Sequence, residues 1–320
     1  MKKENGCLVD HHKLIIMKPI YTIMFFLSLS VFVVSLVALM TYGLNFGVDF
    51  KGGSVLEIKF SNNYPSVEEI TTALKKTAEL AEKDLIVNST GERGFIVRTD
   101  VLSESEHQNI LIQLKSVFKD SGLTEQRFDS VGPVVGRELR NKSFMAIVIM
   151  LIVIMGYIAL VFRKLSKTLS LWVMNMATVV GLLHDIVIPL GLFAVLGHFF
   201  DVQIGAIFVA AILTILGYTV SDKVVIFDRV RENILRGSRE DLGTIVHQSV
   251  MQTLVRSINN TLTVLLSSLA IFLFGGESIK YFALALIVGI FWEPILQYLL
   301  HHRCLCGGIG VAEAGRVDGF

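Results

Sequence analysis

The chain has 320 residues and a formal net charge of +1; 52% of its residues are hydrophobic and only 18% are charged. A soluble protein carries about 25% charged residues, so this composition excludes an ordinary soluble domain. The apolar residues form blocks of about 20, the length that a helix needs to cross a bilayer. No dense basic cluster is present, so we expect the lipid bilayer, and not nucleic acid, as a partner.

Six apolar blocks are long enough to span a membrane. They are Ile20–Tyr42, Ser143–Phe162, Ser170–Leu196, Gly205–Phe227, Ile258–Phe274 and Tyr281–Leu300. The first block is too long for the apolar part of a signal peptide, so it is interpreted as an uncleaved span. Lysine and arginine gather before the first block and after the second and fourth, which predicts that both termini are cytoplasmic. We expect a cytoplasmic segment at 1–19, a first transmembrane helix at 20–42 and five more within 143–302.

The long polar segment Gly43–Lys142 falls on the outer side of the membrane in this topology. Its periodicity predicts the order β-α-β-β-α-β. The expected elements are strands at Ser54–Phe60, Leu85–Ser89, Gly94–Thr99 and Glu125–Ser130, and helices at Ser66–Glu82, capped by Ser66, and Ser103–Ser121. This order is typical of a ferredoxin-like split βαβ unit, and about 100 residues can close a core of their own. The predicted fold class is a membrane α-helical bundle of six transmembrane helices with an α+β ferredoxin-like periplasmic domain.

Three glycines, Gly47, Gly52 and Gly53, flank the connection between the first span and this domain. They are candidates for a flexible hinge between the membrane part and the outer part. They are equally explained by turns that need a positive φ angle, which glycine adopts without steric cost. The sequence does not separate the two interpretations.

Ionisable residues within the spans are the candidate functional residues, because each costs about 2.5–3.5 kcal/mol at the bilayer centre. Asp185 lies in the third span, Asp222 and Lys223 lie in the fourth, and Arg256 lies at the start of the fifth. For Asp222 a proton relay and a structural ion pair are equally good interpretations, whereas Asp185 favours the structural one. Lys223 has two possible placements, one reaching toward the cytoplasmic surface and one paired with Asp222.

The usual motifs of nucleotide binding and hydrolysis are absent from the sequence: there is no phosphate-binding loop, no Gly-x-Ser-x-Gly and no His-Glu-x-x-His. The cluster His301–Cys306 lacks the ligand spacing of a metal site. We therefore expect a protein that is not an enzyme, with neither a metal nor an organic cofactor.

Four motifs give the chain a specific resemblance. They are Phe46–Gly53, Val131–Leu139, Gly217–Asn233 and Gln252–Asn259. In this order and at these places in the topology, they resemble the SecF signature within the SecD/SecF family, which is similar to the resistance-nodulation-division superfamily. The chain departs from that signature at Lys223, where the family usually has a small polar residue, and at Asn260, where Thr or Ser is more common.

The resemblance implies a role in protein export driven by the proton gradient. The partners it implies are a SecD-like subunit, the SecYEG channel, YajC and an unfolded preprotein. It assigns proton passage to Asp222 and Arg256, and we expect Arg256 to lie within reach of Asp222, directly or through water. Asp185 is a further candidate because of its place within a span. One charge crossing 100 mV supplies about 2.3 kcal/mol, enough to bias a two-state motion.

Three alternatives to an export motor remain. A small-molecule exporter of the resistance-nodulation-division type would need about twice the spans and two outer domains in one chain. A non-conducting assembly scaffold would need no proton passage at all. A membrane enzyme is disfavoured by the missing nucleophile and metal motifs.

The C-terminal end departs from the family after Phe291. One possible set of codons for the following residues, with one base inserted at that point, reads as a family-like continuation, Val-Gly-Thr-Tyr-Ser-Ser. We therefore expect that the reading frame is shifted from Trp292 onward and that 303–320 is a disordered tail. The shift places Glu293 and Pro294 at membrane depth, where a charge is costly and a proline removes a backbone hydrogen bond, so we expect a kinked or weakly packed helix there.

Overall fold

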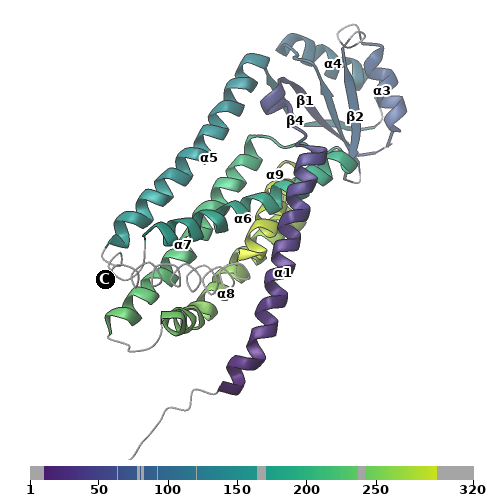
Figure 1. Ribbon diagram of the computed structural model, residues 1–320. Helices are drawn as coiled ribbons and strands as arrows, with labels where there is room; N and C mark the ends of the chain where they lie inside the picture. Colours follow the sequence, from purple (N-terminus) through teal and green to yellow (C-terminus); the bar gives the residue numbers. More distant parts are fainter. Residues whose placement is uncertain are drawn as a thin grey trace, which may run out of the picture.

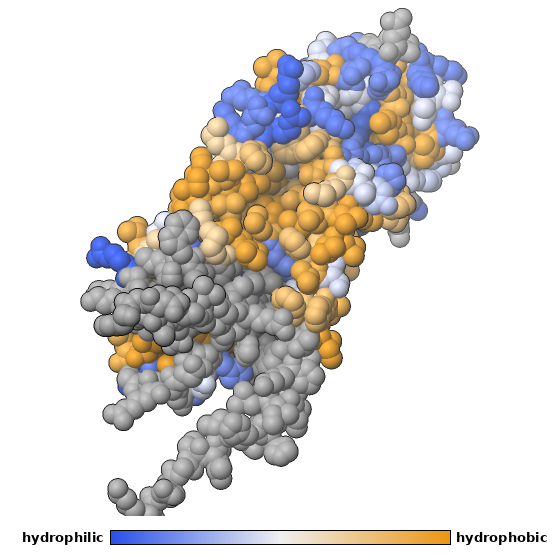
Figure 2. All heavy atoms as spheres, in the orientation of Figure 1, coloured by the Kyte–Doolittle hydropathy of each residue, from blue (hydrophilic) through white to orange (hydrophobic). Residues whose placement is uncertain are grey.

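The computed structural model describes residues 11–62, 64–77, 80, 83–91, 93–119, 121–163, 171–236 and 242–293. Long helices form a bundle, and a smaller α/β unit sits at one end of it (Figure 1). The surface over the helices is largely hydrophobic, whereas the surface over the α/β unit is largely hydrophilic (Figure 2). This division of the surface is expected for a membrane-embedded bundle that carries a water-exposed unit.

The helices of the bundle are α1 (His11–Tyr42), α5 (Pro133–Val161), α6 (Leu171–Phe200), α7 (Ala206–Leu235), α8 (Leu242–Phe274) and α9 (Glu277–Phe291). Among the described residues, α1, α5, α6, α7 and α8 contain candidate membrane spans. They coincide with the first five predicted spans. However, α5 and α8 begin well before the predicted starts at Ser143 and Ile258, because hydropathy marks only the apolar part of a helix that continues beyond the hydrocarbon layer.

The sixth predicted span, Tyr281–Leu300, is described only in part. Helix α9 has 15 residues, and its apolar part, Ile279–Phe291, is shorter than a full span. The predicted kink at Pro294 and the predicted tail at 303–320 lie outside the described residues.

The α/β unit follows the short helix α2 (Val48–Lys51). It consists of β1 (Gly53–Phe60), α3 (Val67–Lys75), β2 (Leu85–Thr90), β3 (Gly94–Thr99), α4 (Glu104–Val117) and β4 (Leu123–Val131). The strands form one antiparallel sheet in the order β2-β3-β1-β4. Alternate β1 side chains, those of Leu56, Ile58 and Phe60, point to one face and share a buried core with α3 and α4. The order of elements along the chain is the predicted one.

Both helices of this unit begin with a reciprocal cap. In α3 the Ser66 hydroxyl accepts from the Glu69 amide while the Glu69 carboxylate accepts from the Ser66 amide, and Ser103 and Glu106 repeat this arrangement in α4. The cap at Ser66 was predicted, but the predicted end of that helix at Glu82 is wrong. Helix α3 stops earlier because the chain turns at Thr77, whose amide donates to the Leu74 carbonyl.

A salt bridge links the N-terminal cap of α4 to the chain segment before β2. Lys83 Nζ donates to Glu106 Oε1 at 2.8 Å. This hydrogen bond and those from Ser103 lower the pKa of Glu106 to about 2. A carboxyl group whose pKa falls on folding stabilises the fold above its unfolded value of 4.5, and it loses that contribution as the pH falls toward 2.

The change Glu106→Gln keeps the cap geometry, because glutamine also serves in a capping box, but it removes the charge that pairs with Lys83. We expect the free energy of local opening of α4 to fall by about 0.2–1 kcal/mol at pH 7 and to lose part of its dependence between pH 4.5 and 2. Amide hydrogen exchange of α4 in the full chain measures both effects. The exposed Glu68→Gln is the matched control, and equal effects of the two changes would contradict the assignment.

Candidate functional site

A buried ion pair joins α6 and α7. Asp185 on α6 and Lys223 on α7 are each 1% exposed, and Lys223 Nζ donates to Asp185 Oδ2 at 3.2 Å. Both sequence-based placements of Lys223 are therefore wrong, since it neither reaches the surface nor pairs with Asp222. The reason is the packing of α7 on α6: successive helical residues point about 100° apart, which turns Lys223 toward Asp185.

Asp222 lies beside this pair and is 2% exposed, so it faces the bundle interior as expected. Glu293, which follows α9, is fully buried, and the charge of Asp222 acts on it. Asp222 Oδ2 has no hydrogen-bond partner among the described residues. The charges of Lys223 and Asp185 also act on Glu293. Three carboxyl groups and one ammonium group thus share one buried region.

His184 connects this region to α1. Its Nε2 lies 2.8 Å from Ser28 Oγ, its ring stacks on Phe32 at 5.5 Å between centroids, and its Nδ1 lies 3.5 Å from Asp185 Oδ1. His184 therefore contacts both α1 and the carboxyl group that pairs with Lys223. The buried polar residues of three helices therefore form one connected group.

Arg256 is not part of this group. Its side chain is exposed on α8, and no hydrogen bond or ion pair between Arg256 and Asp222 exists among the described residues. The expectation that Arg256 lies within reach of Asp222, directly or through water, stays a prediction. Helix α8 presents Ser249, Thr253 and Ser257 to the interior instead.

The chemistry of the buried region follows from its charge balance. One ammonium group cannot neutralise three ionised carboxylates, and like charges that share a buried site disfavour each other's ionisation. A proton on one of these carboxyl groups would lower that electrostatic cost.

A second set of polar contacts fastens the α/β unit to the bundle. The chain after α1 runs beside the loop between α6 and α7: the Gly47 amide donates to the Ile204 carbonyl at 2.8 Å, and the Ile204 amide donates to the Asn45 carbonyl at 2.9 Å. Asp49 Oδ2 accepts from the amide of Ala206, the first residue of α7, at 2.8 Å. A carboxylate in this position stabilises the positive end of the helix dipole.

The three candidate hinge glycines lie in these contacts. Gly52 and Gly53 have φ angles of +87° and +126°. These two glycines therefore adopt the positive φ angles that one of the two interpretations predicted. A side chain on Gly52 would come within 2.8 Å of Pro133 at the start of α5, and one on Gly47 would come within 3.3 Å of the Ile204 carbonyl oxygen. The glycines therefore also permit close approach of two backbones. The hinge interpretation stays a prediction.

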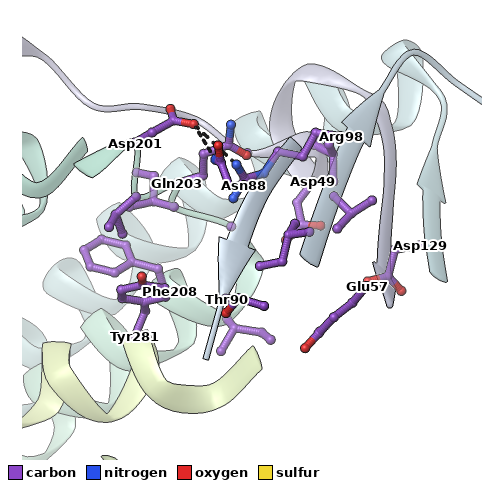
Figure 3. Close-up of a pocket in the computed structure, with 18 of the residues that line it drawn as sticks. Asp49, Glu57, Asn88, Thr90, Arg98, Asp129, Asp201, Gln203, Phe208 and Tyr281 are labelled. Atoms are coloured by element: carbon purple, nitrogen blue, oxygen red, sulfur yellow. Dashed lines mark hydrogen bonds and ion pairs between the residues drawn. The ribbon is translucent and has the colours of Figure 1, made fainter. Parts of the chain in front are cut away.

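Asp201 makes the remaining polar contacts between the α/β unit and the bundle. It accepts hydrogen bonds from Asn45 Nδ2 at 2.8 Å and Asn88 Nδ2 at 3.1 Å and pairs with Arg98 Nη1 at 3.4 Å. Asn88, Arg98 and Asp201 line a pocket of about 310 Å³ between the sheet and the helix ends, with Tyr281 and Phe208 on its other side (Figure 3). Burial lowers the pKa of Arg98, and the charge of Asp201 opposes that effect. Asp201 holds a φ angle of +53°, which only a few residue types other than glycine adopt readily.

Sequence reasoning missed Asp49, Asp201 and Glu293. Asp49 lies inside a motif that was noted for its glycines, and Asp201 is the only charged residue in a short loop between two spans. That isolation was a usable signal, because an outer loop that must bind the polar domain needs a charge. Glu293 carried a signal as a charge at membrane depth, but its neighbours on α7 were not predictable.

Lys223→Met is expected to destabilise the chain by about 3–5 kcal/mol, because it leaves Asp185 as a buried charge without its ammonium partner. The double change Lys223→Met with Asp185→Leu removes both charges and should recover most of the loss. Thermal unfolding of the detergent-solubilised chain measures the free energy differences. A double variant no more stable than Lys223→Met would contradict the pairing.

Asp201→Asn keeps a residue that tolerates a positive φ but removes the charge that pairs with Arg98. We expect hydrogen exchange of the β2 and β3 amides to become about tenfold faster, since a charged hydrogen bond contributes about 1.5–3 kcal/mol. The change Asp100→Asn, at an exposed site next to β3, is the control. Unchanged exchange at β2 and β3 would show that Asp201 does not fasten the sheet.

Comparisons with known proteins agree with this architecture. The family described as protein export membrane protein SecD/SecF, C-terminal, matches residues 113–300, and the SecD/SecF GG motif matches residues 37–63. The protein translocase subunit SecF of Thermobaculum terrenum is 38% identical over 83% of this chain and 85% of the relative. SecF of Haemophilus influenzae is 35% identical over 83% of this chain and 77% of the relative.

Longer proteins match as well. SecDF of Brucella abortus is 34% identical over 78% of this chain and 31% of the relative. The crystal structure of SecDF from Thermus thermophilus, a translocon-associated membrane protein, aligns with a TM-score of 0.75 and 26% identity over 91% of this chain and 38% of that chain. This chain thus spans about a third of the fused proteins and most of the length of those named SecF. The chain belongs to the SecD/SecF family of protein-export membrane proteins.

Proposed function

We propose that the chain is the SecF-type subunit of the Sec protein translocase and that it assists preprotein export across the inner membrane after passage through the channel. Its relatives named SecF support the translocase role. The observation that carries the proton-driven part is the buried carboxyl of Asp222, which has one oxygen without a hydrogen-bond partner among the described residues. An ionised group of this kind is costly within a membrane unless it is paired or protonated, and a group that can be protonated there is a candidate for proton exchange.

The finer topology of the proposal is a bundle of six transmembrane helices with both termini in the cytoplasm and a ferredoxin-like domain in the periplasm. Sheet order β2-β3-β1-β4, with both helices on one face, supports the ferredoxin-like fold. The apolar part of α9 supports a sixth helix that continues beyond Phe291. SecYEG, YajC and the unfolded preprotein are the proposed partners, and the proton gradient is the proposed energy source in place of a cofactor.

A SecD-like subunit is the partner with the most direct support, because relatives exist in which SecD and SecF are fused. Helix α8 offers it a surface. Exposed polar side chains recur along one side of α8, at Gln252, Arg256, Asn259, Thr263 and Ser267. Against lipid, Arg256 would cost about 2.5–3.5 kcal/mol at the bilayer centre, so a protein partner with a carboxyl group is the better neighbour.

The proposed mechanism couples proton exchange to motion of the outer unit through α7. This helix carries Asp222 and Lys223 within the membrane, and its first residue is capped by Asp49. A change of charge at Asp222 alters the attraction between α7 and its neighbours. Because Asp49 and the segment around Gly47 bind the start of α7, a shift of the helix moves the base of the sheet.

Two alternatives to the proposed function remain. A non-conducting scaffold would need the Lys223–Asp185 pair only to fix how α6 and α7 pack. A small-molecule exporter would need a second half with its own outer domain, which a SecD-like subunit would have to supply. Dependence of preprotein export on Asp222 separates the proposed function from both.

Asp222→Asn is expected to abolish proton-gradient-dependent export while leaving the fold intact, because asparagine has nearly the same size but cannot carry a proton on and off. The measurement is export of a preprotein in vesicles with and without a proton gradient, with the complete translocase present. Ser257→Ala, a buried neutral change on α8, is the control. Undiminished export by Asp222→Asn supports the scaffold, and loss of the folded protein supports a purely structural role.

A further inference from the structure

The pocket between the α/β unit and the bundle has two unlike walls. Its sheet side is polar and carries Asn88, Arg98 and Asp129, whereas its helix side carries the aromatic rings of Phe208 and Tyr281 (Figure 3). Its volume of about 310 Å³ lies at the lower end of the range for small-molecule sites. The proposed export function assigns no ligand to this space.

The charges that line the pocket are unbalanced. Four carboxylates and two guanidinium groups take part, those of Asp49, Glu57, Asp129, Asp201, Arg98 and Arg127. Arg98 pairs with Asp201. Arg127 pairs with Asp129. Asp49 accepts the Ala206 amide through Oδ2, and no cation lies within ion-pair distance of it among the described residues. The excess of carboxylates favours a ligand with a positive group.

Arg98 favours an anionic group in the same ligand. Its side chain is only 16% exposed, and its one ion pair among the described residues is that with Asp201, at 3.4 Å. A guanidinium group has five N–H donors, and its strong charge-assisted hydrogen bonds are shorter, about 2.7–2.9 Å. A phosphate or carboxylate in the pocket would accept the donors that Asp201 leaves unused.

The rim of the pocket is apolar and exposed. Phe200 at the end of α6 is 72% exposed, Ile207 at the start of α7 is 38% exposed, and Tyr281 on α9 is 40% exposed. All of them line the pocket. The hydrophobic surface of the bundle meets the hydrophilic surface of the α/β unit at this level (Figure 2), and aromatic residues are enriched where a membrane meets water. The rim therefore suits a ligand that continues into apolar chains.

We propose that this pocket binds the headgroup of a zwitterionic phospholipid with a primary ammonium group, such as phosphatidylethanolamine. The lipid phosphate accepts hydrogen bonds from Arg98, and the ammonium group donates to Asp49. The acyl chains lie over the rim at Phe200 and Tyr281. A soluble zwitterion has the same two charges but makes no use of the rim, and an anionic lipid meets the excess of carboxylates. The proposal goes beyond the export function and does not depend on it.

Lipid titration of the detergent-solubilised full chain, followed by native mass spectrometry, tests the ligand class. Phosphatidylethanolamine should bind at one site at least about tenfold more tightly than phosphatidylglycerol, because only the former supplies an ammonium group for Asp49. Glycerophosphoethanolamine, the same headgroup without chains, should also bind at least about tenfold more weakly than the lipid. Equal affinity for the two lipids overturns the headgroup site, and equal affinity for the soluble headgroup overturns the lipid as its occupant. An extended peptide that displaces the lipid assigns the pocket to a polypeptide and also overturns the proposal.

Two variants test the assigned residues. Arg98→Gln should weaken phosphatidylethanolamine binding by about tenfold or more, since it removes the charged donor to the phosphate. Arg93→Gln, at an exposed site of the same unit outside the pocket, is the matched control. Asp49→Asn keeps a residue that caps a helix but should reduce the preference for phosphatidylethanolamine over phosphatidylglycerol. Size-exclusion chromatography checks folding, and the comparison of lipids on the unchanged chain decides where a variant does not fold. Equal binding by Arg98→Gln and Arg93→Gln overturns the site.

Discussion

The buried ion pair between Lys223 and Asp185 is the interaction on which the arrangement of the membrane part depends. An ammonium group with 1% exposure has no favourable place in a bundle unless a carboxylate meets it. The pair fixes how α7 is rotated against α6, and that rotation places Asp222 toward α9. Without Lys223 held in this way, the position of Asp222 would not be determined.

The same helix connects the two functional regions. With 30 residues and a rise of about 1.5 Å per residue, α7 extends roughly 45 Å, which exceeds the hydrocarbon thickness of a bilayer. Its start is capped by Asp49 and bordered by the backbone pairing of Gly47 with Ile204. A rigid helix bound at one end to the α/β unit and carrying the buried carboxyl group of Asp222 can transmit a small local shift over that distance.

Sequence patterns predicted the features that depend on local physics. Alternation in β1 and the capping residue of α3 predicted the α/β unit, and hydropathy predicted five described spans, because each follows from periodicity or composition. The sequence also selected Asp185 and Asp222, since charge within an apolar block is rare. It did not predict the partner of Lys223 or the exposure of Arg256, because both depend on how one helix rotates against another. The contacts of Asp201 with the α/β unit were not predictable either, because its partners Asn45 and Arg98 are far away in the sequence.

The buried carboxyl of Glu293 links the unusual C-terminal end to the buried charges. If the reading frame is shifted after Phe291, the restored frame has glycine at position 293, and the space beside Asp222 would hold no carboxyl group. Lys223, which departs from the family signature, lies in the same region and supplies the positive charge that lets an additional carboxyl group be buried there. The two departures are thus compatible with each other in physical terms: the lysine pairs with Asp185, and its positive charge also acts on Glu293.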